Sequence, residues 1–284
     1  MLPVATLVAT TAMLSGIGGA ALFTPIFIVI FPLLGPEYPL ESSVAAIGTA
    51  LLTETFGFTS GFVGYYRKRL IDFPLAVRFL KISVPVAIIG ALVAHLVNDA
   101  LLIGGYAILV FILALVLMFF HHDAANDHVS ADGQGPQIVR VDSSGRKFEY
   151  ASPRLGGVSA GITGLGAFLT GLLSVGIGEV VVPQLTKRGV PVAVAAATSV
   201  AVVIVTVAAA SFTLIGQLIR AGGLSAVPWN LVAYTIPGVI IGGQIGPRLQ
   251  GRISQRTMER AIGILFIVIS IAMASVLLKR FGII

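Results

Sequence analysis

The sequence predicts an all-α polytopic membrane protein, and three observations support this fold class. Hydrophobic residues make up 56% of the 284 residues and charged residues only 11%, whereas soluble domains carry roughly 25% charge. The apolar residues are gathered into long runs such as Ala261–Leu278, which approach the ~20 residues that span a bilayer. The runs also recur in the same order on either side of one polar linker, which predicts two related halves.

Each half contains four apolar segments, and the polar linker between the halves covers residues 121–153. We therefore divide the chain into a first membrane repeat at residues 1–120, the linker, and a second membrane repeat at residues 154–284. The segments of the first repeat are Leu2–Leu34, Ser43–Tyr66, Phe73–Val97 and Leu101–Phe120. Those of the second are Leu155–Leu185, Val190–Ile219, Val227–Ile245 and Thr257–Leu278.

Short motifs support the internal repeat. Gly16-Ile17-Gly18-Gly19, followed by Pro25, is echoed by Gly176-Ile177-Gly178-Glu179, followed by Pro183. Further along, the stretch from Pro85 to Gly90 is echoed by the stretch from Pro237 to Gly242, with the same spacing between proline and glycine. An internal repeat of this kind is typical of secondary transporters.

Both repeats start with a segment that glycines interrupt, and such a segment is either one long tilted helix or a re-entrant hairpin. The distribution of the 18 Lys and Arg residues favours the hairpin. If both glycine-broken segments are re-entrant, 15 of these cations lie on one side and 3 on the other, against 12 and 6 if every segment crosses. Cytoplasmic loops are enriched in Lys and Arg. We therefore expect inverted repeats, a cytoplasmic linker, and both termini outside.

The linker is expected to hold a small β-hairpin outside the bilayer. Alternating residues at Gln137–Val141 and Arg146–Tyr150 flank the turn-forming residues Asp142-Ser143-Ser144-Gly145, which is a hairpin pattern. His121, His122, Asp123, Asp127 and His128 resemble a metal cluster. They belong to no regular element, so we interpret them as a polar loop and expect no metal site.

Composition excludes several classes of function. The formal net charge of +6 comes mainly from residues at the ends of apolar segments, where they orient a membrane protein, so we do not expect a nucleic-acid partner. The chain has no cysteine, which excludes disulfides, thiolate metal sites and a Cys nucleophile. The first 34 residues lack the basic start of a cleavable signal peptide. We expect no cofactor.

The glycine turns are the predicted substrate site. If they are re-entrant, both reach toward the bilayer midplane and each precedes a half-helix with free N–H groups. Glycine lets the backbone approach a ligand closely, so the turns together suit a small oxyanion. Alternatively, these glycines only pack helices tightly. The predicted binding residues are Gly16, Gly18, Gly19, Gly176 and Gly178, with hydroxyls from Thr49, Thr198 and Ser199.

Two carboxylates are candidates for proton coupling. Glu54 lies near the middle of an apolar segment, and Glu179 directly follows the second glycine turn. An ionisable residue inside a membrane segment is costly and points to function. The structural alternatives are a hydrogen-bonded residue for Glu54 and a partner of the helix dipole for Glu179. Ile204 takes the place that matches Glu54 in the second half, so the halves are not equivalent.

The motifs above resemble the sulfite exporter TauE/SafE family, also called TSUP. The resemblance also covers Ala197-Thr198-Ser199 and the stretch from Pro228 to Gly246, and so nearly the whole chain apart from the linker. It implies a multi-pass permease of the cytoplasmic membrane for sulfite, thiosulfate, sulfoacetate or a similar organosulfur anion. Glu179 departs from the glycine that the first copy has. An anion channel and a membrane-embedded enzyme are the alternatives, and no motif for catalysis supports the enzyme.

Overall fold

The fold of the protein is given by a computed structural model. It describes residues 1–16, 18–31, 42–119, 137–249 and 255–280, and it is almost entirely helical over these ranges. The metal-like cluster of the linker, from His121 to His128, lies outside the described residues.

The helices follow the eight apolar segments of the sequence. The first half contains α1 (Leu2–Ser15), α2 (Ala20–Pro25) with its π-helical continuation η1 (Ile26–Ile30), α4 (Ser43–Arg67), α5 (Phe73–Ala94) and α6 (Asp99–Phe119). The second half contains α7 (Gly157–Leu173), α8 (Ile177–Thr186), α9 (Val192–Gly222), the short η2 (Leu224–Ala226), α10 (Trp229–Leu249) and α11 (Gln255–Arg280).

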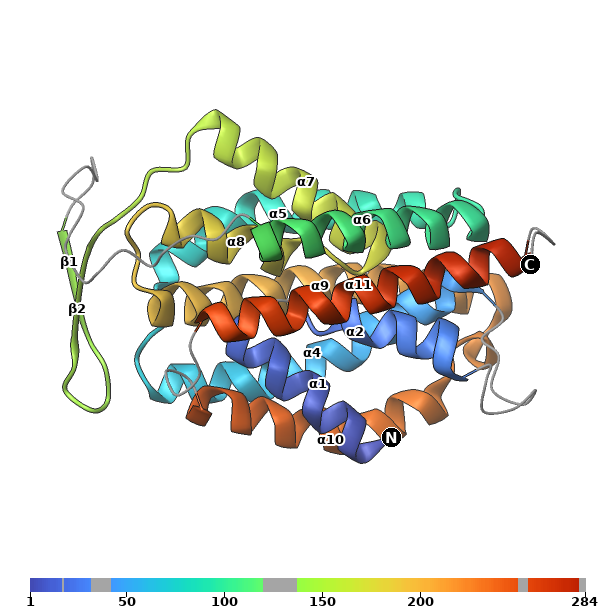
Figure 1. Cartoon of the computed structure of the whole chain (residues 1–284), viewed down its shortest axis with the longest axis horizontal. Helices are drawn as coiled ribbons and strands as arrows, with labels where there is room; N and C mark the ends of the chain where they lie inside the picture. The colour runs from blue at the N-terminus through green and yellow to red at the C-terminus, as the bar shows by residue number, and fades with distance from the viewer. Residues whose placement is uncertain (17, 32–41, 120–136, 250–254, 281–284) are drawn as a thin grey trace.

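Each glycine-broken segment consists of two helices that meet at the glycine turn. The chain reverses direction at both turns, so α2 runs back from the end of α1, and α8 runs back from the end of α7 (Figure 1). With a rise of about 1.5 Å per residue, the 14 residues of α1 and the 17 of α7 extend for about 21 and about 26 Å. Both are shorter than the hydrocarbon core of a bilayer, about 30 Å.

The helices of the two halves pack in a reciprocal pattern. Helix α1 lies against α10, and α7 lies against α5; α4 contacts α9 and α10, while α9 contacts α4 and α5. The last helices of the halves, α6 and α11, lie against each other across the front of the bundle (Figure 1). Helix α9 is central, because 67% of its apolar stretch is buried, against 28–33% for α5, α6 and α11.

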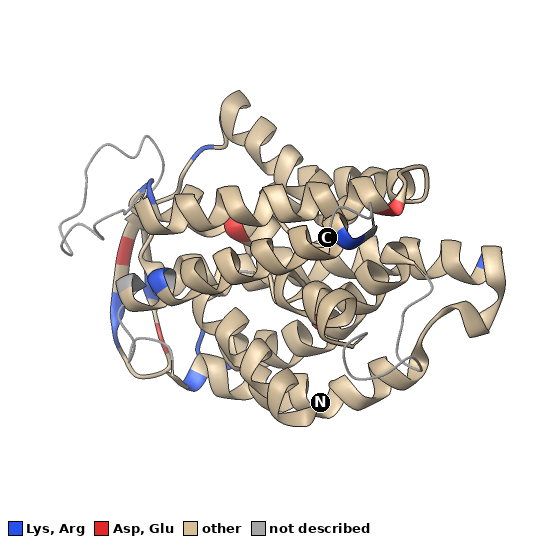
Figure 2. Ribbon diagram, turned by 45° about the vertical axis from the view of Figure 1, so that its right-hand side comes forward, with Lys and Arg blue, Asp and Glu red and all other residues tan. Residues whose placement is uncertain are grey.

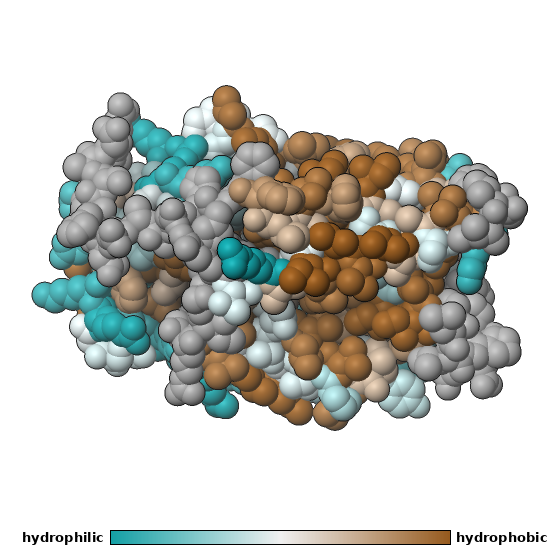
Figure 3. All heavy atoms as spheres, viewed as in Figure 1, coloured by the Kyte–Doolittle hydropathy of each residue, from teal (hydrophilic) through white to brown (hydrophobic). Residues whose placement is uncertain are grey.

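The surface is that of a membrane protein. Among the described residues, α5, α6, α9 and α11 are long and apolar enough to cross a bilayer by length and composition. Apolar side chains cover the middle of the face shown in Figure 3. Large apolar side chains such as Leu7, Ile108 and Phe212 are exposed. Lys and Arg gather mainly at the end that carries the β-hairpin (Figure 2). A soluble protein rarely exposes an apolar belt of this extent.

Glycines allow several helix pairs to touch backbone to backbone. A Cβ at Gly90 of α5 would lie 2.2 Å from the carbonyl oxygen of Phe168 on α7. A Cβ at Gly242 of α10 would lie 2.4 Å from that of Thr6 on α1. Small residues are the usual means of close helix packing in membranes. Gly61 of α4 also lies on a packing face, because a Cβ there would meet the side chain of Met13 on α1 and the carbonyl oxygen of Gly243 on α10.

The β-hairpin predicted in the linker is confirmed. Strand β1 (Gln137–Val141) pairs antiparallel with β2 (Lys147–Ala151), so the second strand starts one residue later than expected. The hairpin docks on the turn between α4 and α5: the buried hydroxyl of Tyr150 donates to Asp72 Oδ2 at 2.6 Å, and Arg140 donates to the carbonyl of Ile71. Burial, with the bond to Asp72, raises the pKa of Tyr150.

Candidate functional site: two helix breaks and two carboxyl groups

The two helix breaks begin in the same way. α1 ends at Gly16 and α7 ends at Ser174, and both residues are left-handed, with φ of 69° and 63°. The N–H of each donates to a carbonyl four residues earlier, which is a common way to end a helix. Glycine adopts this conformation freely, whereas serine does so with strain.

These caps correct the register of the predicted repeat. Matched by cap, Ser174 takes the place of Gly16, and Pro183 takes that of Pro25, with an offset of 158 residues in both cases. The motifs alone suggest an offset of 160, which places Glu179 opposite Gly19. With the offset of 158, Glu179 instead matches Ala21 on α2, so it is a substitution within the helix and not within the turn.

Glu54 connects the middle of α4 to the first break. Its side chain is 2% exposed, and its Oε1 accepts a hydrogen bond from the N–H of Gly19 at 2.5 Å. On the other side of the same break, the hydroxyl of Ser199 on α9 donates to the carbonyl of Gly16 at 3.2 Å. The first break is therefore held by α4 and α9, and the N–H of Gly19 is occupied by a carboxyl group.

Glu179 plays the corresponding part at the second break. It is the third residue of α8, and its Oε2 accepts from the N–H of Gly176 at 3.0 Å, as the acidic residue of a capping box does. Thr170 Oγ1 accepts from the N–H of Ile177 at 2.8 Å. Gly176 has φ of 144° and a Cβ there would lie 2.5 Å from the carbonyl oxygen of Gly166, so this position requires glycine.

The two carboxyl groups meet at Gly18. A Cβ built there would lie 3.3 Å from Glu54 Oε1 and 3.7 Å from Glu179 Oε1, so these oxygens are at most about 7 Å apart by the sum of the two distances. The two breaks themselves also touch, because the hydroxyls of Thr24 on α2 and Ser174 share a hydrogen bond of 2.6 Å. The site therefore combines residues from both halves of the chain.

Three polar atoms around these breaks and on α4 are buried without a hydrogen-bond partner: Glu54 Oε2, Glu179 Oε1 and Thr49 Oγ1. A buried polar atom without a partner typically costs about 1–3 kcal/mol, so such atoms usually have a functional explanation. Neither carboxyl group forms an ion pair within the described ranges. The geometry thus provides oxygen atoms and N–H groups for a proton or a small ligand, and no Lys or Arg of the described residues pairs with them.

The structure brings most, but not all, of the predicted binding residues to this place. Gly18 and Gly19 lie at the carboxyl groups, and Gly178 is buried in the first turn of α8. Thr198 differs from its neighbour Ser199, because its hydroxyl accepts from the N–H of Asp72 at 3.0 Å. It therefore joins α9 to the start of α5, beneath the hairpin, and not to either break.

Tyr106 is a residue of the site that the sequence analysis did not identify. It lies on α6, is 1% exposed, and its hydroxyl donates to the carbonyl of Ala21, directly after the first break. Its electrostatic interaction with Glu54 and Glu179 shows that it lies near both. A buried tyrosine hydroxyl usually needs a hydrogen-bond partner. The single tyrosine inside the apolar run Leu101–Phe120 could therefore have indicated a polar contact within the membrane segment.

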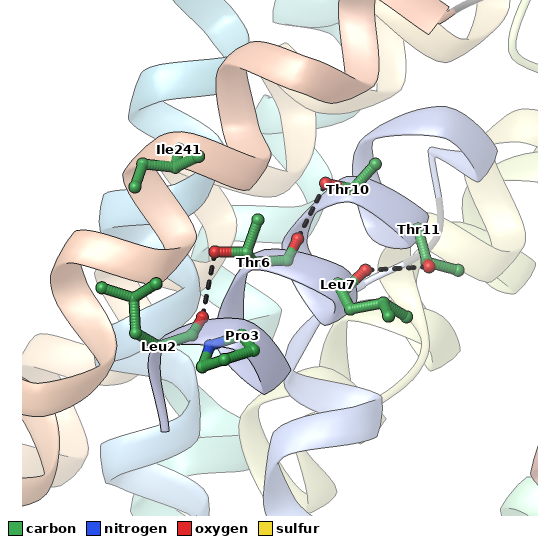
Figure 4. Close-up of a pocket in the computed structure, with 7 residues that line it drawn as sticks. All are labelled: Leu2, Pro3, Thr6, Leu7, Thr10, Thr11 and Ile241. Atoms are coloured by element: carbon green, nitrogen blue, oxygen red, sulfur yellow. Dashed lines mark hydrogen bonds between the residues drawn. The ribbon is translucent and has the colours of Figure 1, made fainter.

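A surface groove at the start of α1 is not part of this site. It is lined by Leu2, Pro3, Thr6, Leu7, Thr10, Thr11 and Ile241 (Figure 4). The hydroxyls of Thr6, Thr10 and Thr11 each donate to the carbonyl four residues earlier, as threonine often does within helices. Because these hydroxyls already donate within the helix, they are not available to bind an oxyanion. The exposed leucines of the groove suit contact with lipid.

Comparisons with known proteins identify the family of the chain. The family model described as sulfite exporter TauE/SafE matches residues 1–273. The chain is similar to the "Probable membrane transporter protein YunE" of Bacillus subtilis (strain 168), with 26% identity over 265 residues that cover 92% of this chain and 91% of that protein. No solved structure matches the chain. The chain therefore belongs to the sulfite exporter TauE/SafE family and is a multi-pass membrane transporter.

Proposed function

We propose that this transporter moves a small sulfur-containing anion across the cytoplasmic membrane in a proton-coupled manner. The anion is sulfite, thiosulfate, sulfoacetate or a similar organosulfonate. The observation that carries the proposal is the meeting of two helix breaks and two buried carboxyl groups at Gly18. Backbone N–H groups at such breaks suit anions, and carboxyl groups in a membrane interior suit protons.

The proposed anion site lies between the two breaks. Its donors are the backbone N–H groups of Gly19 and Gly176, with Gly18 leaving the space for close approach. The hydroxyl of Ser199 holds the first break by donating to the carbonyl of Gly16. Gly178 lies in the first turn of α8, and the buried hydroxyl of Thr49 has no hydrogen-bond partner. We place Thr198 at the edge of the site, since its hydroxyl contacts Asp72. Neutral donors of this kind bind an anion without the tight grip of a buried Lys or Arg.

The proposed topology has two re-entrant hairpins, α1–α2 and α7–α8, and six crossing helices. The two halves, residues 1–120 and 154–284, are then inverted repeats on either side of the linker at residues 121–153. The short arms of the hairpins, the reciprocal packing of α1 on α10 and α7 on α5, and the cations at the hairpin end support this arrangement (Figure 2). Under the positive-inside rule the β-hairpin is cytoplasmic and both termini face outside.

Flux into proteoliposomes tests the function. Purified protein is reconstituted, and uptake of radiolabelled sulfite, thiosulfate and sulfoacetate is measured with and without an inward proton gradient. We expect at least one of these anions to accumulate above its equilibrium level when the gradient is present. Flux that only dissipates the anion gradient and ignores protons would identify a channel instead. Flux of none of the three anions would refute the proposed substrate class.

A further inference from the structure

The carboxyl groups of the site occupy the same backbone donors that an anion would use. Glu54 Oε1 is bonded to the N–H of Gly19, and Glu179 Oε2 is bonded to the N–H of Gly176. The second oxygen of each group, Glu54 Oε2 and Glu179 Oε1, is buried and has no hydrogen-bond partner. An ionised carboxyl group is itself a planar oxyanion, so in that form each group places an anion of the protein's own at its break.

We propose that Glu54 and Glu179 are built-in competitors of the transported anion. Each carboxylate occupies a break in the empty protein, and the transported anion binds only when a proton neutralises the carboxylate and releases the N–H group. Proton and anion are coupled because they must enter the site together. This inference rests on the proposed function, since it requires that the site between the breaks be the anion site.

The exchange is balanced in charge and in hydrogen bonds. One proton from water adds to the unpartnered carboxylate oxygen, for example Glu54 Oε2, and gives a neutral carboxylic acid. The N–H of Gly19 then passes from Glu54 Oε1 to an oxygen of the incoming anion, and the new O–H of Glu54 can donate to the same anion. The proton cancels the charge of the carboxylate and the transported anion brings its own, so a monoanion is balanced by one proton. A dianion such as thiosulfate is balanced when Glu54 and Glu179 each take up one proton, and no bond other than O–H is made.

The surroundings allow this charge to be exchanged and not merely masked. Two titratable groups among the described residues interact electrostatically with Glu54, namely Glu179 and Tyr106. The phenol of Tyr106 on α6 lies near both carboxyl groups and is neutral at physiological pH. Apart from Glu179 itself, the described contacts of α2, α8 and α9 with the breaks come from backbone groups and hydroxyls, such as Thr24 and Ser199. Since neither carboxyl group forms an ion pair with another described residue, a second anion at the same place requires a proton.

Competition makes a prediction that simple proton relay does not make. If each carboxylate must be neutralised first, the affinity for the anion depends on pH by linkage. The Kd of the wild type should fall about tenfold or more for each unit by which pH is lowered, while the carboxyl groups are ionised in the empty protein. A relay group that only passes protons leaves the affinity of the anion independent of pH.

The experiment measures binding of thiosulfate to the full-length protein in detergent between about pH 5 and about pH 8, the range that separates the two models. Thiosulfate suits this purpose because its own charge does not change over the range. The variants are Glu54→Gln, Glu179→Gln and the double variant. Asp99→Asn is the matched control, because Asp99 accepts from the N–H of Ser43 at the far end of α4, at 3.1 Å, and takes no part in the exchange.

We expect the wild type and Asp99→Asn to bind more tightly as pH falls, and the double variant to bind with a Kd that does not depend on pH. At neutral pH the double variant should bind at least as tightly as the wild type. Binding by the wild type that does not depend on pH, or a double variant that keeps the wild-type pH dependence, would overturn the inference alone. If the wild type binds neither thiosulfate nor sulfite nor sulfoacetate at any pH, the proposed function itself fails, and the inference fails with it.

Discussion

Replacing Gly18 with alanine probes the space between the two carboxyl groups with a single methyl group. The new Cβ would lie 3.3 Å from Glu54 Oε1 and 3.7 Å from Glu179 Oε1. The first contact is tight and the second is ordinary van der Waals contact. The methyl therefore fills the place that we assign to the anion.

The effect on folding should be small and the effect on binding large. An extra methyl group in a packed interior costs about 1–3 kcal/mol at most sites, and Glu54 needs to yield by only a few tenths of an ångström. Loss of one hydrogen bond to a charged ligand costs about 1.5–3 kcal/mol, which corresponds to a rise in Kd of about tenfold to about 150-fold. Gly18→Val should abolish binding, since its branched side chain is larger still.

Binding of thiosulfate at acidic pH and thermal unfolding are measured on the same preparations. Gly105→Ala on α6 is the matched control, because a Cβ there meets only Leu173 Cδ1, at 3.8 Å. The other break glycines are poor probes: Gly16 and Gly176 have φ of 69° and 144°, so substitutions there strain the backbone. A Gly18→Ala protein that folds and binds with wild-type affinity would refute the assignment of the site.

Three further predictions concern packing, the hairpin and topology. Gly90→Ala should lower the free energy of unfolding by about 1–3 kcal/mol, because its Cβ meets a backbone carbonyl at 2.2 Å, whereas Gly216→Ala meets nothing within 4 Å and should be close to neutral in the same thermal unfolding assay. Asp72→Ala should make the linker more sensitive to proteolysis, because the buried hydroxyl of Tyr150 loses its acceptor. The pKa of Tyr150 is raised in the folded protein, so the stability that its bond to Asp72 contributes is complete below the unfolded pKa of about 10. That stability disappears as pH rises through the folded pKa. The wild-type linker should therefore stay protected from proteolysis up to about pH 10. Ser144→Cys, a lone cysteine at the exposed hairpin tip, should react with an impermeant maleimide only from the cytoplasmic side; labelling from outside would reverse the proposed topology.

The features that composition and motif order determine were predictable from the sequence. Glycines interrupt the first segment of each half, and the structure ends α1 and α7 at these turns. Alternation around Asp142-Ser143-Ser144-Gly145 predicted the β-hairpin, which forms. Glu54 and Glu179 were notable as carboxyl groups within or beside apolar segments, and both lie at Gly18. These predictions depend on local chain chemistry, which the sequence expresses directly.

The contacts between helices were not predictable in the same way. Helices that are apolar on every side have no periodicity to indicate which face meets which neighbour. The bond from Gly19 to Glu54, the bond from Tyr106 to Ala21, and the placement of Thr198 against Asp72 all depend on those faces. The match between the two breaks also needed the structure, because the glycine motifs pair Gly16 with Gly176, whereas the left-handed caps pair Gly16 with Ser174.

The most direct test of the account is an experimental structure of the full chain with thiosulfate bound at acidic pH. We predict density for the anion between the two breaks, within hydrogen-bond distance of the N–H groups of Gly19 and Gly176. The carboxyl groups of Glu54 and Glu179 should have moved off those donors. An anion bound instead among Arg67, Lys68 and Arg69, with both carboxyl groups still bonded to the breaks, would contradict both the site and the exchange.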